Sequence, residues 1–190
     1  MGYKQTAIFT GLAVVSAFGL FGCKEPGYRV VGDNGDAVAE HAAKRSDAIA
    51  FLLKTSVYVG EIRAMAVLPS GAELSVQANK MAALQSEADL LGNVVSPYSH
   101  CRGAGYKASE YWSTVAGNIR TESPDSALAA YVEEAQQCQG QVDNAPVAMT
   151  YIETDIGKNP PVEGCLKIVS LGSDEKVQEW SCPSGSLPKS

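Results

Sequence analysis

The 190-residue sequence lacks several signatures of common chemistries. Basic residues do not outnumber acidic ones, because 15 lysines and arginines stand against 21 aspartates and glutamates, a formal net charge of −6. This balance excludes a typical nucleic-acid binder, which needs a basic surface. The chain has only two histidines, His41 and His100, and no Cys-x-x-Cys pair. We therefore expect no zinc site, no dithiol redox centre and no cofactor.

Enzyme motifs are missing as well. There is no Gly-x-Ser-x-Gly sequence, and the short run Gly103-Ala104-Gly105 falls short of the phosphate-binding Gly-x-Gly-x-x-Gly pattern. We expect His41 on the polar side of a helix and His100 in a loop, neither with a catalytic role. The composition, 45% hydrophobic and 19% charged, is that of a folded domain. The sequence thus predicts a globular protein that is not an enzyme.

The N-terminus has the pattern of an export signal. Lys4 is the only charged residue among the first 22, and residues 7–22 are apolar or small. This stretch has signal-peptide length and is shorter than the ~20 apolar residues of a typical membrane span. It ends in Leu20-Phe21-Gly22-Cys23, which resembles the lipobox of bacterial lipoproteins.

The lipobox resemblance implies cleavage before Cys23, a diacylglycerol on its sulfur and a further acyl chain, such as palmitate, on its new amine. Several acyl chains together give a stable anchor. The alternatives are an ordinary signal peptide, with Cys23 a plain thiol, and an uncleaved anchor. Lys24 follows where the inner-membrane retention signal has aspartate, so we expect the outer membrane, periplasmic side. Removal of residues 1–22 leaves 168 residues with a formal net charge of −7.

The remaining chain predicts an α+β fold, mainly helical, with a small C-terminal antiparallel β-hairpin. Residues 23–36 are expected to form a lipidated tether, with a short strand at 28–31. Residues 37–140 are expected to hold about four helices, at 37–67, at 72–91, near 108–119 and at 124–139. In the first helix, seven residues form a stripe at helical spacing: Val38, Ala42, Arg45, Ile49, Leu52, Ser56 and Val59. The centre of this helix, 48–53, is apolar almost all round, so we expect it deep in a core, and a membrane span over 48–68 is the alternative.

The start of the fourth helix carries the clearest local signal. Ser123 suits the N-cap and Pro124 suits the first helical position. We expect Gly140 to end this helix. Residues 141–190 are expected to form a small β-rich module packed on the helices, with strands near 147–152, 165–171 and 176–182.

Four cysteines remain for disulfides in an exported chain: Cys101, Cys138, Cys165 and Cys182. They allow three pairings. A hairpin centred between residues 173 and 174 places Cys165 opposite Cys182. Antiparallel third and fourth helices bring Cys101 within about one turn of Cys138. The sequence therefore favours the pairs Cys101–Cys138 and Cys165–Cys182.

Acidic residues are the strongest hint of a partner. Two groups are candidates for binding a basic protein, one near the fourth helix and one on the hairpin: Glu122, Asp125, Glu133 and Glu134, and Asp174, Glu175 and Glu179. A plain solvated surface is the alternative. The main hypothesis is an immunity or inhibitor protein that neutralises a toxin or cell-wall-lytic effector. A pilotin-like assembly accessory of an outer-membrane secretion machine is the second hypothesis, and an envelope enzyme the third.

Overall fold

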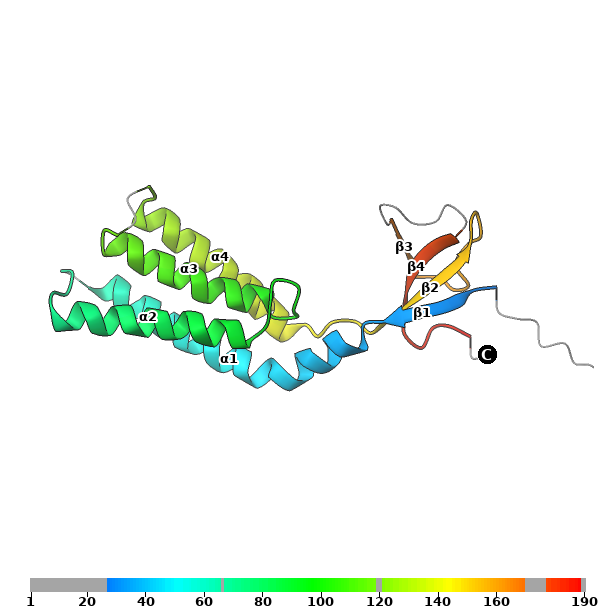
Figure 1. Ribbon diagram of the computed structural model, residues 1–190, viewed down its shortest axis with the longest axis horizontal. Coiled ribbons are helices and arrows are strands. Elements are labelled where there is room, and N and C mark those ends of the chain that lie inside the picture. The colour runs from blue at the N-terminus through cyan, green and yellow to red at the C-terminus, as the bar shows by residue number, and fades with distance from the viewer. Residues whose placement is uncertain (1–26, 66, 119–120, 170–176, 189–190) are drawn as a thin grey trace, which may run out of the picture.

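The computed structural model describes residues 27–65, 67–118, 121–169 and 177–188, and within them four helices and a four-stranded antiparallel sheet form an α+β fold (Figure 1). This confirms the predicted fold class. The elements follow in the order β1 (Arg29–Asp33), α1 (Gly35–Ala64), α2 (Ala72–Leu90), α3 (Ser99–Val115), α4 (Pro124–Asp143), β2 (Met149–Asp155), β3 (Leu166–Ile168) and β4 (Val177–Pro183). Within these ranges, none of the helices combines the length and hydrophobicity needed to span a membrane.

The four helices bury one apolar core. Gly105 of α3 shows how closely they approach, because an added Cβ there would lie 2.7 Å from Phe51 of α1 and 2.9 Å from Ala88 of α2. The large buried side chains come from all four helices and include Phe51, Val59, Ile62, Met81, Leu84, Tyr111, Trp112 and Tyr131. The disulfide Cys101–Cys138 crosses this core and ties α3 to α4, with a Cα–Cα distance of 4.5 Å.

The starts of α2 and α4 agree with the prediction, whereas α3 begins at Ser99, well before the start expected near residue 108. Ser123 caps α4 as predicted, with its hydroxyl accepting a hydrogen bond from the Ser126 N–H at 3.1 Å. The centre of α1 enters the core as expected through Ala48 and Phe51, whereas Leu53 is 64% exposed. The buried residues of α1 are His41, Ala48, Phe51, Thr55, Val59 and Ile62, so Val59 is the member of the helical stripe that is buried. The centre of α1 is apolar almost all round, so its sequence alone does not choose between neighbouring faces.

Two histidine placements also need correction. His41 is buried rather than on a polar face, and its ring stacks on Tyr98 with 4.9 Å between centroids. His100 lies in the first turn of α3, not in a loop. Both histidines form a hydrogen bond to Gln141 of α4. The His41 Nε2–H donates to the Gln141 carbonyl at 2.8 Å, and the His100 backbone N–H donates to the side-chain oxygen of Gln141 at 3.1 Å. These bonds explain why α4 continues past Gly140 to Asp143, against our expectation.

The sheet has the order β1-β2-β4-β3. Leu166 pairs with Ser181 and Ile168 with Glu179, which is the register predicted for the hairpin. The disulfide Cys165–Cys182 staples this hairpin, so both predicted cysteine pairs are confirmed. The predicted strand near residues 147–152 is β2. The segment expected to be a tether forms β1, which pairs with β2 at the edge opposite β4. The sheet is therefore larger than a hairpin.

The sheet and the helices meet at one short junction. Asn34, between β1 and α1, accepts a hydrogen bond from the Met149 N–H at 2.7 Å, and its amide donates to the Val147 carbonyl at 2.9 Å. Figure 1 shows the sheet beyond the end of the helical bundle, past the first turns of α1. This differs from the packing we expected. The sheet buries Ile152 and Cys182 within its own unit and needs no helix to cover them.

Candidate functional site: a groove between two helices

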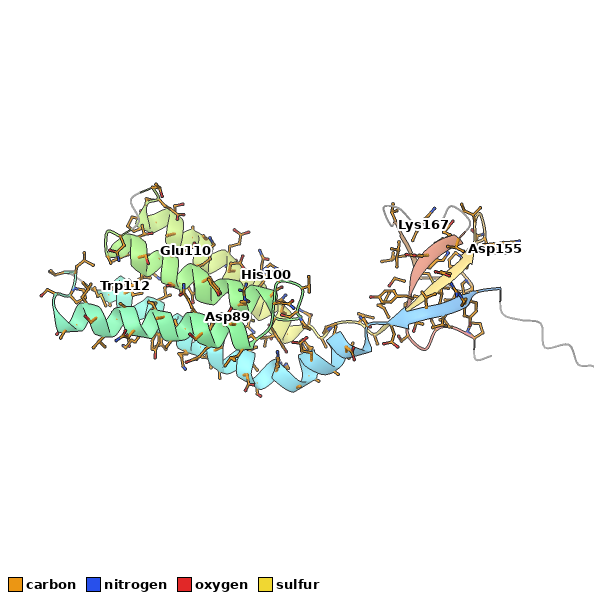
Figure 2. The ribbon with its side chains drawn as sticks, viewed as in Figure 1. Asp89, His100, Glu110, Trp112, Asp155 and Lys167 are labelled. Carbon is orange, nitrogen blue, oxygen red and sulfur yellow. A yellow bond between two sulfur atoms is a disulfide. The ribbon has the colours of Figure 1, made fainter. Side chains whose placement is uncertain are left out.

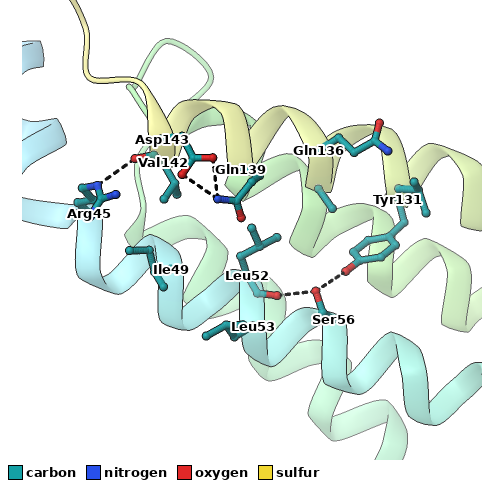
Figure 3. Close-up of a pocket in the computed structure, with 12 residues that line it drawn as sticks. Arg45, Ile49, Leu52, Leu53, Ser56, Tyr131, Gln136, Gln139, Val142 and Asp143 are labelled. Carbon is teal, nitrogen blue, oxygen red and sulfur yellow. Dashed lines mark hydrogen bonds between the residues drawn. The ribbon is translucent and has the colours of Figure 1, made fainter.

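A groove with a volume of about 490 Å³ runs between α1 and α4 (Figure 3). Its α1 wall is formed by Arg45, Ile49, Leu52, Leu53 and Ser56, and its α4 wall by Tyr131, Val132, Ala135, Gln136, Gln139, Val142 and Asp143. We call it the α1/α4 groove. Arg45 and Ser56 are eleven positions apart along α1, which makes the groove ~16 Å long at ~1.5 Å per residue.

Hydrogen bonds between the helices close the groove at both ends (Figure 3). At one end, the Arg45 Nε–H donates to the Val142 carbonyl at 2.9 Å. At the other end, the Ser56 hydroxyl donates to the Leu52 carbonyl, so the Tyr131 hydroxyl donates to Ser56 at 3.3 Å. Tyr131 is itself buried, and this burial raises the pKa of its hydroxyl above the ordinary value. The two helices are thus held apart at a fixed spacing.

The middle of the groove is apolar and open to solvent. Leu53 leaves 64% of its surface exposed and Val132 leaves 41% exposed. Ile49, Leu52 and Ala135 are half-buried beneath them. Large apolar side chains that line a concave surface together are a mark of an interaction site, whereas single exposed ones are ordinary. The groove therefore offers an apolar floor to another molecule.

One acidic residue, Asp143, lines the α4 wall of the groove, and Arg45 lines the α1 wall. Helix α4 carries Asp125, Glu133, Glu134 and Asp143 and has no lysine, arginine or histidine. Of the four, Glu134 pairs with His100 of α3 at 2.9 Å, and the other three form no ion pair in the described part of the chain. The negative end of the helix dipole adds to the charge of Asp143 at the last residue. This wall favours a positively charged partner.

The predicted acidic residues do not form one surface. Glu122 accepts a hydrogen bond from the Ser126 hydroxyl at 3.0 Å, and Glu133 accepts one from Gln137 at 3.3 Å. Glu134 faces α3, where Gly103 leaves space for its carboxylate. Glu179 lies in β4 of the sheet, away from these helix residues, as the position of the sheet shows (Figure 1).

Three predicted site residues lie outside the described ranges: Cys23, Asp174 and Glu175. The acidic candidates that remain come from two separate units of the fold. Among the labelled side chains of Figure 2, His100 and Glu110 lie in the bundle, whereas Asp155 and Lys167 lie in the sheet. The five acidic candidates that the structure describes therefore do not form one binding face.

The described residues contain no candidate metal centre. No group of three or more His, Cys, Asp or Glu side chains there could hold a metal ion. His41 uses its ring in the core, and Glu153 pairs with Arg29 across β1 and β2. The arrangement that does stand out is the apolar groove between α1 and α4.

The sequence analysis did not identify the α1/α4 groove, because the apolar centre of α1 was expected to lie in the core. Four residues of the helical stripe of α1 line the α1/α4 groove: Arg45, Ile49, Leu52 and Ser56. The signal that could have found it is the width of the apolar surface between Ala48 and Leu53. One face enters the core through Ala48 and Phe51, and a second face is left for the groove.

Comparison of the chain with models of known protein families, with curated proteins and with solved structures finds no match.

Proposed function

We propose that this protein is a non-enzymatic protein-binding module of the bacterial envelope whose α1/α4 groove receives a basic amphipathic helix of a partner. The observation that carries the proposal is the apolar groove beside α4, a helix that carries four acids, with Asp143 in the groove lining, and no basic residue. Cys23, acylated as the lipobox resemblance implies, anchors the chain in the outer membrane with the folded part on the periplasmic side.

The dimensions of the groove fit a helix. A groove of ~16 Å accommodates about three helical turns, and an amphipathic helix places apolar side chains at i, i+3 or i+4 and i+7 along that length. Leu53 and Val132 offer exposed apolar contacts, and Ile49 and Leu52 lie deeper. Burial of a leucine-sized side chain contributes ~1.5–3 kcal/mol, so apolar anchors in the groove offset part of the cost of association.

The charge of the groove selects among amphipathic helices. Exposed carboxylates of Asp125, Glu133 and Asp143 attract lysines and arginines on the polar side of a bound helix. Such charges raise the association rate and discriminate against acidic partners more than they add affinity. Complex formation should accordingly weaken at high salt.

An immunity or inhibitor protein is the best interpretation of this arrangement. An anchored acidic domain, held by two disulfides and built to bind a basic helix, is suited to neutralising a basic toxin or cell-wall-lytic effector. A pilotin-like accessory of an outer-membrane secretion machine is the second candidate. The groove itself supports that reading too, because a pilotin also takes up a segment of its partner.

Crosslinked pull-down from envelope extracts, followed by mass spectrometry, tests the proposal. Wild-type chain should recover one basic protein in stoichiometric amount, and Leu53→Asp should lose it. Val94→Asp is the matched control, because Val94 is 76% exposed and lies in the connection between α2 and α3, away from the groove. Recovery of a toxin or lytic effector supports the immunity function, and recovery of a secretion component supports the pilotin function. Equal recovery by Leu53→Asp and wild type would refute both.

A further inference from the structure

A tight turn follows β2 at the end of the sheet that lies away from the helices, where Figure 2 labels Asp155. The Lys158 N–H donates to the Asp155 carbonyl at 3.1 Å, and Gly157 between them has a φ of 76°. A positive φ at the third position is required in a type II β-turn and suits glycine. Ile156 occupies the second position and is 61% exposed, and Lys158 is exposed as well. The 155–158 turn therefore presents an isoleucine and a lysine to the solvent.

The 155–158 turn lies beside the start of β1. Arg29 pairs with Glu153 at this end of the sheet, whereas Asp33, at the other end of β1, leads into the helices. A cleft of about 490 Å³ is lined by residues from both segments: Gly27, Tyr28, Asp155, Lys158, Asn159 and Pro161. Cys23 precedes Gly27 by four positions, and four residues span ~14 Å at most. An acyl anchor on Cys23 would therefore keep this turn close to the bilayer.

The chemistry of the turn suits a phospholipid surface. An isoleucine can enter the boundary between headgroups and acyl chains, while a lysine keeps its stem along apolar groups and its ammonium at the phosphates. Lys158 forms no ion pair with any residue that the structure describes. Asp155 beside it is also exposed, so the two charges offset each other. Burial of Ile156, rather than attraction to anionic lipid, should dominate this contact.

The helical bundle is less suited to a bilayer surface. Residues 34–144 hold 13 acidic and eight basic residues, so anionic lipid repels this part of the chain. Figure 1 shows the bundle on the side of the sheet that the helices reach through the junction at Asn34. The turn and the bundle thus extend from opposite ends of the sheet.

We propose that the 155–158 turn lies on the phospholipid surface of the membrane that anchors the chain, with Ile156 entering the boundary between headgroups and acyl chains. This inference rests on the lipid anchor at Cys23 in the proposed function. One isoleucine does not hold a free domain at a bilayer, whereas an anchor a few residues away gives it a high local concentration of lipid. The helices then extend away from the bilayer, which leaves the α1/α4 groove open to a periplasmic partner.

Fluorescence quenching in vesicles tests this contact. The full chain is produced in bacteria, so that its lipidation can occur, and is inserted into vesicles of phosphatidylethanolamine and phosphatidylglycerol with brominated acyl chains. A fluorescent amino acid replaces Asn159, next to the turn, or Val67, which is 82% exposed in the connection between α1 and α2. Brominated lipid should quench the fluorophore at position 159 and leave the one at position 67 unquenched.

Ile156→Ser separates a lipid contact of the turn from mere proximity to the anchor. This change should weaken the quenching at position 159 about twofold, because the serine no longer enters the apolar boundary. Val147→Ser is the matched control, because Val147 is 67% exposed and precedes β2 at the opposite end of the sheet. It should leave the quenching unchanged. High salt should also leave the quenching in place, since the contact depends on apolar burial.

Flotation of the same vesicles distinguishes failure of this inference from failure of the proposed function. A chain that floats with the vesicles but is not quenched at position 159 would overturn the contact and leave the anchor intact. Equal quenching in wild type and Ile156→Ser, or loss of quenching at high salt, would overturn it as well. A chain that does not float would overturn both the anchor and the contact. Leu53→Asp alters the α1/α4 groove alone, so it should float and be quenched like wild type.

Discussion

Removing each disulfide in turn should unfold a different part of the molecule. The Cys165–Cys182 disulfide spans 17 residues within the sheet, and the Cys101–Cys138 disulfide spans 37 residues within the bundle. In the chain-entropy model these separations correspond to about 3.1 and about 3.8 kcal/mol of stabilisation. The sheet is the smaller unit and buries few apolar side chains, so it should depend more on its disulfide.

We expect Cys165→Ala with Cys182→Ala to unfold the sheet at 25 °C and to leave the helical melting transition in place. We expect Cys101→Ala with Cys138→Ala to lower the melting temperature of the helices by about 20 °C, since ~1 kcal/mol corresponds to ~4–8 °C in a domain of this size. In the described part of the chain the two units are joined by hydrogen bonds at the Asn34 junction, so each change should stay local.

The two tryptophans report on the two units separately. Trp112 is buried in α3, and Trp180 lies in β4, where its indole N–H donates to the Thr154 hydroxyl at 3.0 Å. Each indole N–H gives its own signal in a proton–nitrogen correlation spectrum. Loss of the Trp180 signal alone is expected in the first variant. Loss of both signals together would refute the description of the sheet and bundle as separately stabilised units.

Three further predictions follow from single residues. Ser123→Ala removes the N-cap of α4 and should lower the free energy of unfolding by ~1 kcal/mol in urea denaturation; an unchanged midpoint would contradict the cap. Burial raises the pKa of Tyr98, Tyr111 and Tyr131, so the folded state keeps protons that the unfolded chain releases. The stabilisation from these three protonated tyrosines is complete below pH ~10 and is lost as the pH rises through their raised pKa values. A melting temperature that does not fall by pH ~11.5 would contradict this pH dependence. Cys23→Ala should abolish labelling with radioactive palmitate, and persistent labelling would exclude this cysteine as the anchor.

Short-range signals in the sequence proved the most informative. The cap at Ser123 depends on neighbouring residues alone, and the hairpin register depends on two cysteines only 17 positions apart, Cys165 and Cys182. Both could be predicted because turn chemistry and cysteine spacing act locally. The disulfide between α3 and α4 could also be predicted, since a short connection makes those helices antiparallel.

Long-range contacts decided the features that the sequence left open. The pairing of β1 with β2 joins residues more than 100 positions apart, and nothing local to Arg29–Asp33 specifies it. His41 is buried because Tyr98 and Gln141 meet it from two other helices. Gln77 looked like a surface residue from its polarity, yet the packing of α2 buries it. The candidate site was missed for the same reason, because a groove exists only once α1 and α4 are placed side by side.

Photo-crosslinking in intact cells tests the central claim most directly. A benzophenone amino acid at position 53 lies in the α1/α4 groove, and the same amino acid at position 94 lies outside it. We predict that position 53 crosslinks one envelope protein, that the crosslinked peptide maps to a basic amphipathic helix, and that position 94 gives no such product. Crosslinks of equal yield at both positions, or a crosslinked segment that is acidic or not helical, would contradict a groove that receives a basic helix.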